Sequence, residues 1–202
     1  KEMVASLDNE NATKSYEYAK SLLDKSAEAA RSLGVERLNA GSSAGSHSIG
    51  VRQRKDMSTQ AWNEAKSALG SAFNQYGIGD GRMTGLFSLS VDQLKKLQDE
   101  APTFWAKLDD DVRGYLEDII KANKSAEELK DTLYENLTGI SFDSLFDNFL
   151  ESLYDMKATS KDISNDMADD MRKSLIKAFA VENYKDKMKE WYTKWAEALK
   201  DG

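Results

Sequence analysis

The lone histidine of this chain lies in a setting that could suggest nucleophilic catalysis. His47 is flanked by Ser46 and Ser48, which are residue types that a Ser-His-Asp triad uses. A triad works only when its members are held rigidly, and the surrounding stretch 39–50 consists mostly of glycine, serine and alanine. We therefore expect no catalysis at His47.

Carboxylates are the other side chains that could take part in catalysis or bind a metal ion. Paired carboxylates perform glycoside hydrolysis when their environments separate their pKa values. Here the acidic residues fall on polar helical faces, and no pattern predicts their burial. The run Asp109–Asp111 lacks the glycine and the distal glutamate of an EF-hand, so we interpret it as negative charge early in a helix. The sequence predicts no catalytic, cofactor-binding or metal-binding residue, and no cofactor.

A glycine-rich segment, Tyr76–Gly81, has the composition of a phosphate-binding loop. No strand precedes it, and no Gly-Lys-Ser/Thr sequence follows it, so neither common nucleotide-binding motif fits. We predict a turn at this segment.

The composition narrows the class of protein further. The 202 residues are 40% hydrophobic and 31% charged, with one proline and no cysteine. Disulfides, cysteine-zinc sites and thiol nucleophiles are thereby excluded. The near absence of proline favours long uninterrupted helices, and no run of about 18 apolar residues predicts a transmembrane segment.

The net charge of −7 is spread unevenly along the sequence. Residues 61–140 carry −5 and residues 141–170 carry −6, whereas residues 171–202 carry +3. The acidic middle disfavours binding to nucleic acid, so we expect no specific nucleic acid partner. The basic end can pair with the acidic stretch before it, within the chain or with a neighbouring molecule.

The patterns together predict an all-α protein of elongated helices with a small antiparallel C-terminal helical bundle. We expect an N-terminal helix within residues 1–38 that ends at Gly34, and a Gly/Ser-rich flexible linker over 39–57. A helical bundle domain over 58–202 follows, with breaks near 77–90 and 138–141.

Helix boundaries can be predicted from capping residues. Serines suited to cap helix N-termini occur at Ser58, Ser90 and Ser141. Ser58 is expected to begin a helix that continues to Phe73. Pro102 fits the first turn of a helix, and the longest periodic stretch runs from Thr103 to Leu137. A break is expected near 122–125, because Ser125 and Glu128 have the spacing of a capping box.

Three apolar stripes near the C-terminus predict three helices joined by turns. They consist of Phe142, Leu145, Phe146, Phe149, Leu150, Leu153 and Tyr154; of Ile163, Met167, Met171, Leu175 and Phe179; and of Tyr184, Met188, Trp191, Tyr192, Trp195 and Leu199. An acidic row, Asp143, Asp147, Glu151 and Asp155, accompanies the first stripe. We expect the stripes to pack on one another. The last stripe could instead face a membrane surface or a ligand, or form an interface with another chain.

Four segments resemble the tail tape-measure proteins of phages and prophages of Bacteroides and its relatives. They are Gly81–Ser90, Ala101–Leu108, Leu137–Phe149 and Met188–Tyr192. The resemblance covers roughly residues 58–200 and consists of capping, turn and core patterns without any catalytic signature.

The resemblance implies a long helical structural protein that determines tail length during assembly and leaves the tail ahead of the DNA. Because the chain begins Lys1-Glu2-Met3, we expect it to be a compact fragment of the longer protein, located in the virion tail and in the host cytoplasm during assembly. It would not be an enzyme. Expected partners are other tail proteins (tube, tip or chaperone), or a second copy through two aromatic stripes. These stripes are Trp191/Tyr192/Trp195 and Phe142/Phe146/Phe149.

Two alternatives to a tape-measure protein stay open. One is a helical scaffold or adaptor domain of another bacterial system. The other is a peptidoglycan hydrolase module, which would need a pocket with a buried carboxylate of raised pKa.

Overall fold

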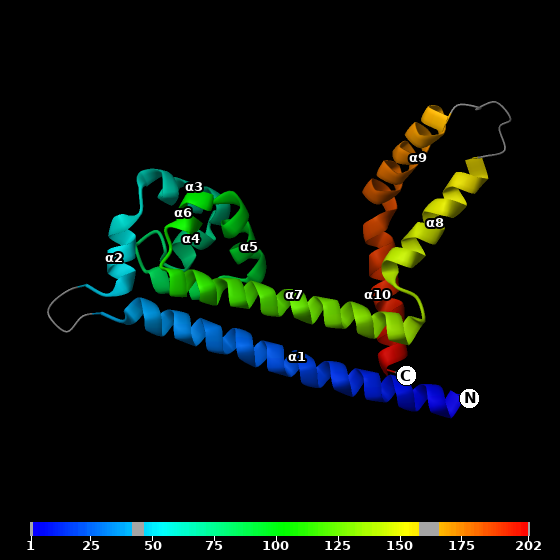
Figure 1. The fold of residues 1–202 in the computed structure, drawn as a ribbon, viewed down its shortest axis with the longest axis horizontal. Coiled ribbons are helices and arrows are strands. Elements are labelled where there is room, and N and C mark those ends of the chain that lie inside the picture. Colours follow the sequence, from blue (N-terminus) through cyan, green and yellow to red (C-terminus); the bar gives the residue numbers. More distant parts are fainter. Residues whose placement is uncertain (1, 42–46, 158–165, 202) are drawn as a thin grey trace. The chain divides into compact units, whose positions relative to one another are not determined.

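The computed structural model describes residues 2–41, 47–157 and 166–201, and every regular element in these ranges is a helix (Figure 1). The predicted all-α class is confirmed. The chain forms two compact units, a central unit (Ala19–Glu127) and a terminal unit (Lys1–Tyr18 with Glu128–Gly202). Helices α1 (Glu2–Asn39) and α7 (Asp110–Thr138) contribute residues to both. This division differs from the one expected at residues 38 and 57.

The central unit consists of short helices packed on parts of α1 and α7. They are α2 (Ile49–Asp56), α3 (Thr59–Leu69), α4 (Ala72–Gln75), the 3-10 helix η1 (Met83–Ser88), α5 (Val91–Glu100) and α6 (Pro102–Ala106). Helix α3 packs on both α5 and α6. The ring of Trp62 contacts the rings of Phe73 and Phe104, with centroids 5.7 and 5.8 Å away. These contacts form one continuous apolar core.

The linker predicted over 39–57 is wrong for its second half, where α2 forms. Ser48 caps this helix by accepting a hydrogen bond from the backbone N–H of Val51 at 3.3 Å. Gln53 is buried among the residues of the central unit. The mostly polar sequence of α2 gave little helical periodicity, so packing determines its structure. His47 is exposed before this helix, while Ser46 lies outside the described residues.

The predicted end of the first helix at Gly34 is also wrong, because α1 continues to Asn39. A Cβ atom at position 34 would overlap the ring of Phe87 in η1. Glycine therefore allows η1 to approach the helix closely.

The long periodic stretch divides at a different place from the one predicted. Helix α6 ends at Ala106 and α7 begins at Asp110, and α7 then continues without interruption through 122–125. Asp109 accepts a hydrogen bond from the N–H of Val112 at 3.3 Å and so helps to cap α7. The acidic run is thus negative charge at a helix start, as interpreted above, but it lies at the N-terminus of α7 and not early in a helix that begins near Thr103. Ser125 is in mid-helix, because buried contacts of α7 outweigh its capping preference.

Other local predictions are confirmed. Backbone N–H groups donate to the Oγ atoms of the predicted capping serines at 3.1 Å (Ser58), 3.2 Å (Ser90) and 3.2 Å (Ser141). Pro102 is in the first turn of α6, and Tyr76–Gly81 lies in a turn region. The helix after Ser58 ends at Leu69, however, and does not continue to Phe73.

The terminal unit contains the helices that carry the three apolar stripes. Helix α8 (Phe142–Lys157) runs antiparallel to α9 (Asp166–Ala180), as Figure 1 shows, and the two are in contact. The turn expected after α9 is replaced by a π-helical segment, η2 (Val181–Lys185), which leads directly into α10 (Asp186–Asp201). Ile163 and the side chains of Asp155 and Met167 lie outside the described part of the chain.

Candidate protein-binding surface on the terminal unit

The polar residues considered for chemistry do not converge in the described part of the chain. Within it, no group of three or more acidic or histidine side chains could hold a metal ion. Asp143, Asp147 and Glu151 are exposed along one side of α8. Asp109 forms hydrogen bonds with Arg37, as discussed below.

Most of the aromatic residues predicted to mediate self-association lie in the core of the terminal unit. Tyr192 is 1% exposed, Phe146 4% and Phe142 8%. The rings of Phe142 and Tyr192 contact each other at 5.7 Å between centroids. These three side chains follow the packing interpretation, so they do not form a free surface. Trp191, in contrast, is exposed and stacks on Trp195 at 5.5 Å.

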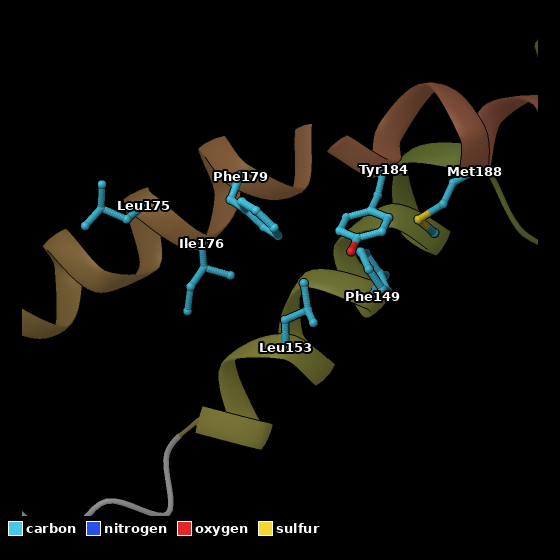
Figure 2. A pocket seen from close by; sticks show the side chains of 7 residues that line it. All are labelled: Phe149, Leu153, Leu175, Ile176, Phe179, Tyr184 and Met188. Atoms are coloured by element: carbon cyan, nitrogen blue, oxygen red, sulfur yellow. The ribbon is translucent and has the colours of Figure 1, made fainter. Parts of the chain in front are cut away.

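An apolar groove lies between α8 and the continuous helical segment formed by α9, η2 and α10 (Figure 2). Its volume is about 750 Å³. The groove is lined by Phe149 and Leu153 of α8, by Leu175, Ile176 and Phe179 of α9, and by Tyr184 and Met188. No lining side chain carries a charge.

The aromatic ring of Tyr184 determines the shape of the middle of the groove. Its centroid is 6.0 Å from that of Phe149 and 5.9 Å from that of Phe179, both in edge-to-face geometry. Such pairs stabilise beyond the area that they bury. The three rings therefore connect both walls of the groove.

The π-helical segment explains why the groove extends from α9 into α10. The groove side of α9 has Leu175 and Phe179 four residues apart, but Tyr184 follows after five. A π-helix, which has i→i+5 hydrogen bonds, takes up this extra residue. Tyr184 and Met188 therefore stay on the side of Phe179.

The lysines that follow the groove residues point to another side of the helix. The Nζ of Lys185 lies 5.4 Å from the ring centroid of Phe146, and that of Lys189 lies 4.8 Å from Phe142. Lys189 also pairs with Asp131 at 3.4 Å. These cation–π contacts and this ion pair keep positive charge away from the groove.

The sequence predicted the stripes of the groove but not which of their members stay exposed. Leu175 is 65% exposed, Met171 63% and Phe179 56%, whereas Ile176 and Ala180 are buried against α8. The five-residue step between Phe179 and Tyr184 was the one available signal of the π-helical segment. Exposure itself depends on which neighbours cover α9, which spacing does not encode.

Comparisons with known proteins give no match among family models, curated proteins or solved structures. Among the described residues, no helix has the combination of length and apolar composition needed to cross a membrane. The groove is therefore interpreted from its own chemistry.

Proposed function

We propose that this chain is a structural protein that acts by binding another protein through the apolar groove, and that it is not an enzyme. The observation that carries this proposal is the set of large apolar side chains exposed on α9, η2 and α10. Leu175, Phe179 and Tyr184 line the groove, and Met171 and Trp191 are exposed on the same helical segment. Contiguous exposed apolar surface commonly marks a protein interaction site.

The lining of the groove supports binding over catalysis. A hydrolase needs polar groups placed around a reacting bond, whereas the only polar side-chain atom among the lining residues is the Tyr184 hydroxyl. An elongated apolar groove beside a helix matches the mode in which amphipathic helices bind. The purified chain should therefore leave peptidoglycan intact, and release of soluble fragments from peptidoglycan would contradict this part of the proposal.

We further propose that the chain has this structural role in a phage tail, as part of a tape-measure protein. The resemblance of the four segments described above supports this assignment, as does the presence of long helices. Helix α1 has 38 residues and α7 has 29. At about 1.5 Å per residue, such helices convert residue number into length. The proposed partners are other tail proteins, and the proposed location is the virion tail.

Immunoblotting and immunogold electron microscopy would test the phage assignment. Antibodies raised against the purified chain should detect it in purified tailed particles and label their tails. Particles that contain the tail-tube protein but lack this chain would contradict the proposal. A gene of ordinary length outside a cluster of tail genes would favour the scaffold or adaptor alternative.

A further inference from the structure

The α8–α9 hairpin forms only one layer of helices over much of its length. Within the described residues, the extensive contacts of α9 are with α8 and η2. On α9, which is half of this layer, Ile176 and Ala180 are buried, whereas Leu175 and Phe179 are exposed. A helical layer with apolar residues on a second side requires another layer to cover them. Two such hairpins stacked face to face have the architecture of a four-helix bundle.

We propose that the groove binds a second copy of this chain, so that two α8–α9 hairpins form a symmetric four-helix bundle. This inference rests on the proposed role of the groove as a protein-binding surface and specifies its partner.

The exposed apolar area is of the size that such a dimer needs. Five large side chains on this surface, Met171, Leu175, Phe179, Tyr184 and Trp191, are between 43% and 65% exposed. With about 150–250 Å² for a large aromatic side chain, they offer on the order of 500 Å² of apolar surface. A standard interface buries about 800 Å² per partner, of which the polar rim supplies the remainder.

The surface around the groove is also compatible with a copy of itself. A twofold interface places the same patch on both partners, so a patch with one sign of charge would repel its copy. Residues three or four positions from Phe149 and Leu175 share their helix faces. The neighbours in question are Leu145, Phe146, Ser152, Leu153, Met171, Arg172, Ala178 and Phe179. Of these, only Arg172 carries a charge, and its side chain is partly buried.

The shape of the surface matches this arrangement as well. The side chain of Leu175 is exposed at one end of the groove, and the ring of Tyr184 lies between those of Phe149 and Phe179 (Figure 2). In a face-to-face pair, the Leu175 side chain of each copy can enter the groove of the other. This is the knobs-into-holes packing of helical bundles.

Sedimentation-velocity ultracentrifugation of the full 202-residue chain tests the proposal, over a concentration range from about 1 to 100 µM. We expect a dimer. The Leu175→Asp variant should weaken the dimer by roughly 30-fold or more, since it places a charge at the centre of the interface. The matched control is Leu22→Asp on α1, where the leucine is 50% exposed and remote from the groove residues in sequence, and it should leave the dimer unchanged.

A second variant separates loss of the dimer from loss of the fold. Met171→Lys lies one turn from Leu175 and replaces a side chain that is 63% exposed, so the monomer should keep its helical circular dichroism and its melting temperature. It should dissociate the dimer as Leu175→Asp does. Because the chain has no cysteine, Ser152→Cys also provides a single site for a spin label, and a defined distance between labels on two copies is expected.

Two results would overturn this inference. One is a monomer throughout the concentration range. The other is a dimer that Leu175→Asp weakens no more than Leu22→Asp does. A monomer that is nevertheless present in purified tails would leave the proposed function in place, whereas a groove-dependent dimer that is absent from tails would remove the phage assignment alone.

Discussion

Glu197 on α10 accepts a hydrogen bond from the phenol of Tyr134 on α7, and this bond connects the two helices within the terminal unit. Tyr134 is 2% exposed. Its burial raises the pKa of the phenol, and the bond to Glu197 raises it further. The same bond is the main cause of the lowered pKa of Glu197. The neutral phenol of Tyr134 therefore donates to the charged carboxylate of Glu197 at the edge of the core.

The Tyr134→Phe substitution should lower the free energy of unfolding by about 1 kcal/mol near pH 7, because it removes one hydrogen bond to a charged group. The value is modest because the Glu197 side chain is 39% exposed and solvent screens its charge. The lowered pKa of Glu197 means that its stabilisation is complete above the ordinary glutamate pKa and is lost as the pH falls through the lowered value.

Urea unfolding near neutral pH and near pH 3 would measure this effect. The difference between the wild type and Tyr134→Phe should shrink in acid. Tyr18→Phe, at a tyrosine that is 70% exposed, is the control and should change stability little at either pH. An undiminished difference in acid would show that the charge of Glu197 does not contribute.

The second prediction concerns the pair of Arg37 and Asp109 in the central unit. The guanidinium donates to both carboxylate oxygens, with each N–O distance 3.0 Å. Hydrogen bonding by Arg37 lowers the pKa of Asp109. Asp109→Asn keeps a side chain that can cap α7 but removes the charge, so it should lower the melting temperature.

Asp110→Asn is the matched control, since the side chain of the adjacent Asp110 is 90% exposed. Differential scanning calorimetry in low and high salt should show a larger loss for Asp109→Asn, and salt should reduce the difference. The contribution of Asp109 is present above the ordinary aspartate pKa and disappears as the pH falls through its lowered value. Equal melting temperatures for the two variants at low salt would contradict the prediction.

Two helical glycines should respond oppositely to alanine. At Gly34 the new methyl group would overlap the buried ring of Phe87, and such overpacking costs about 1–3 kcal/mol. At Gly114 in α7, no atom beyond the chain neighbours and the nearby backbone of the helix itself lies within 4 Å of the new methyl group. Gly114→Ala should therefore stabilise the protein by about 0.5–1 kcal/mol through helix propensity. Chemical denaturation measures both, and a stabilised Gly34→Ala variant would mean that Phe87 can move aside.

These positions also show what the sequence could predict. Ser58, Ser90 and Ser141 cap helices as expected, because a cap depends on a few consecutive residues. Gly34 and Ser125 have the local signature of helix boundaries, yet both lie within helices. Their true setting depends on residues distant in sequence, such as Phe87, and one sequence does not reveal those neighbours.

The same limit applies to the candidate site. Periodicity identified Leu175 and Phe179 as members of an apolar stripe, but it also assigned Tyr192 and Phe146 to an interaction surface. In the structure the first two are exposed and the last two are buried. Periodicity defines which side of a helix is apolar, whereas coverage by other helices decides which apolar residues remain available to a partner.

The last prediction concerns the carbonyl oxygen of Ile140, in the turn that joins α7 to α8. The hydroxyl groups of Tyr192 and Thr138 each lie 2.8 Å from this oxygen. Thr138 also lies 2.7 Å from the carbonyl oxygen of Tyr134, and its single hydroxyl proton can serve only one acceptor at a time. We expect the Tyr192 hydroxyl to donate to the Ile140 carbonyl oxygen, while the Thr138 hydroxyl donates to the Tyr134 carbonyl oxygen.

Tyr192→Phe should then cost less than about 1 kcal/mol, because Thr138 can redirect its proton to Ile140. Thr138→Val should also lower the free energy of unfolding only slightly through its effect on Ile140, since the Tyr192 hydroxyl still donates to that carbonyl oxygen. The double variant leaves the Ile140 carbonyl without either donor, so its loss should exceed the sum of the single losses by about 0.5–1 kcal/mol. Urea unfolding of the four proteins measures this coupling, and strictly additive losses would show that the two hydroxyl groups do not substitute for each other.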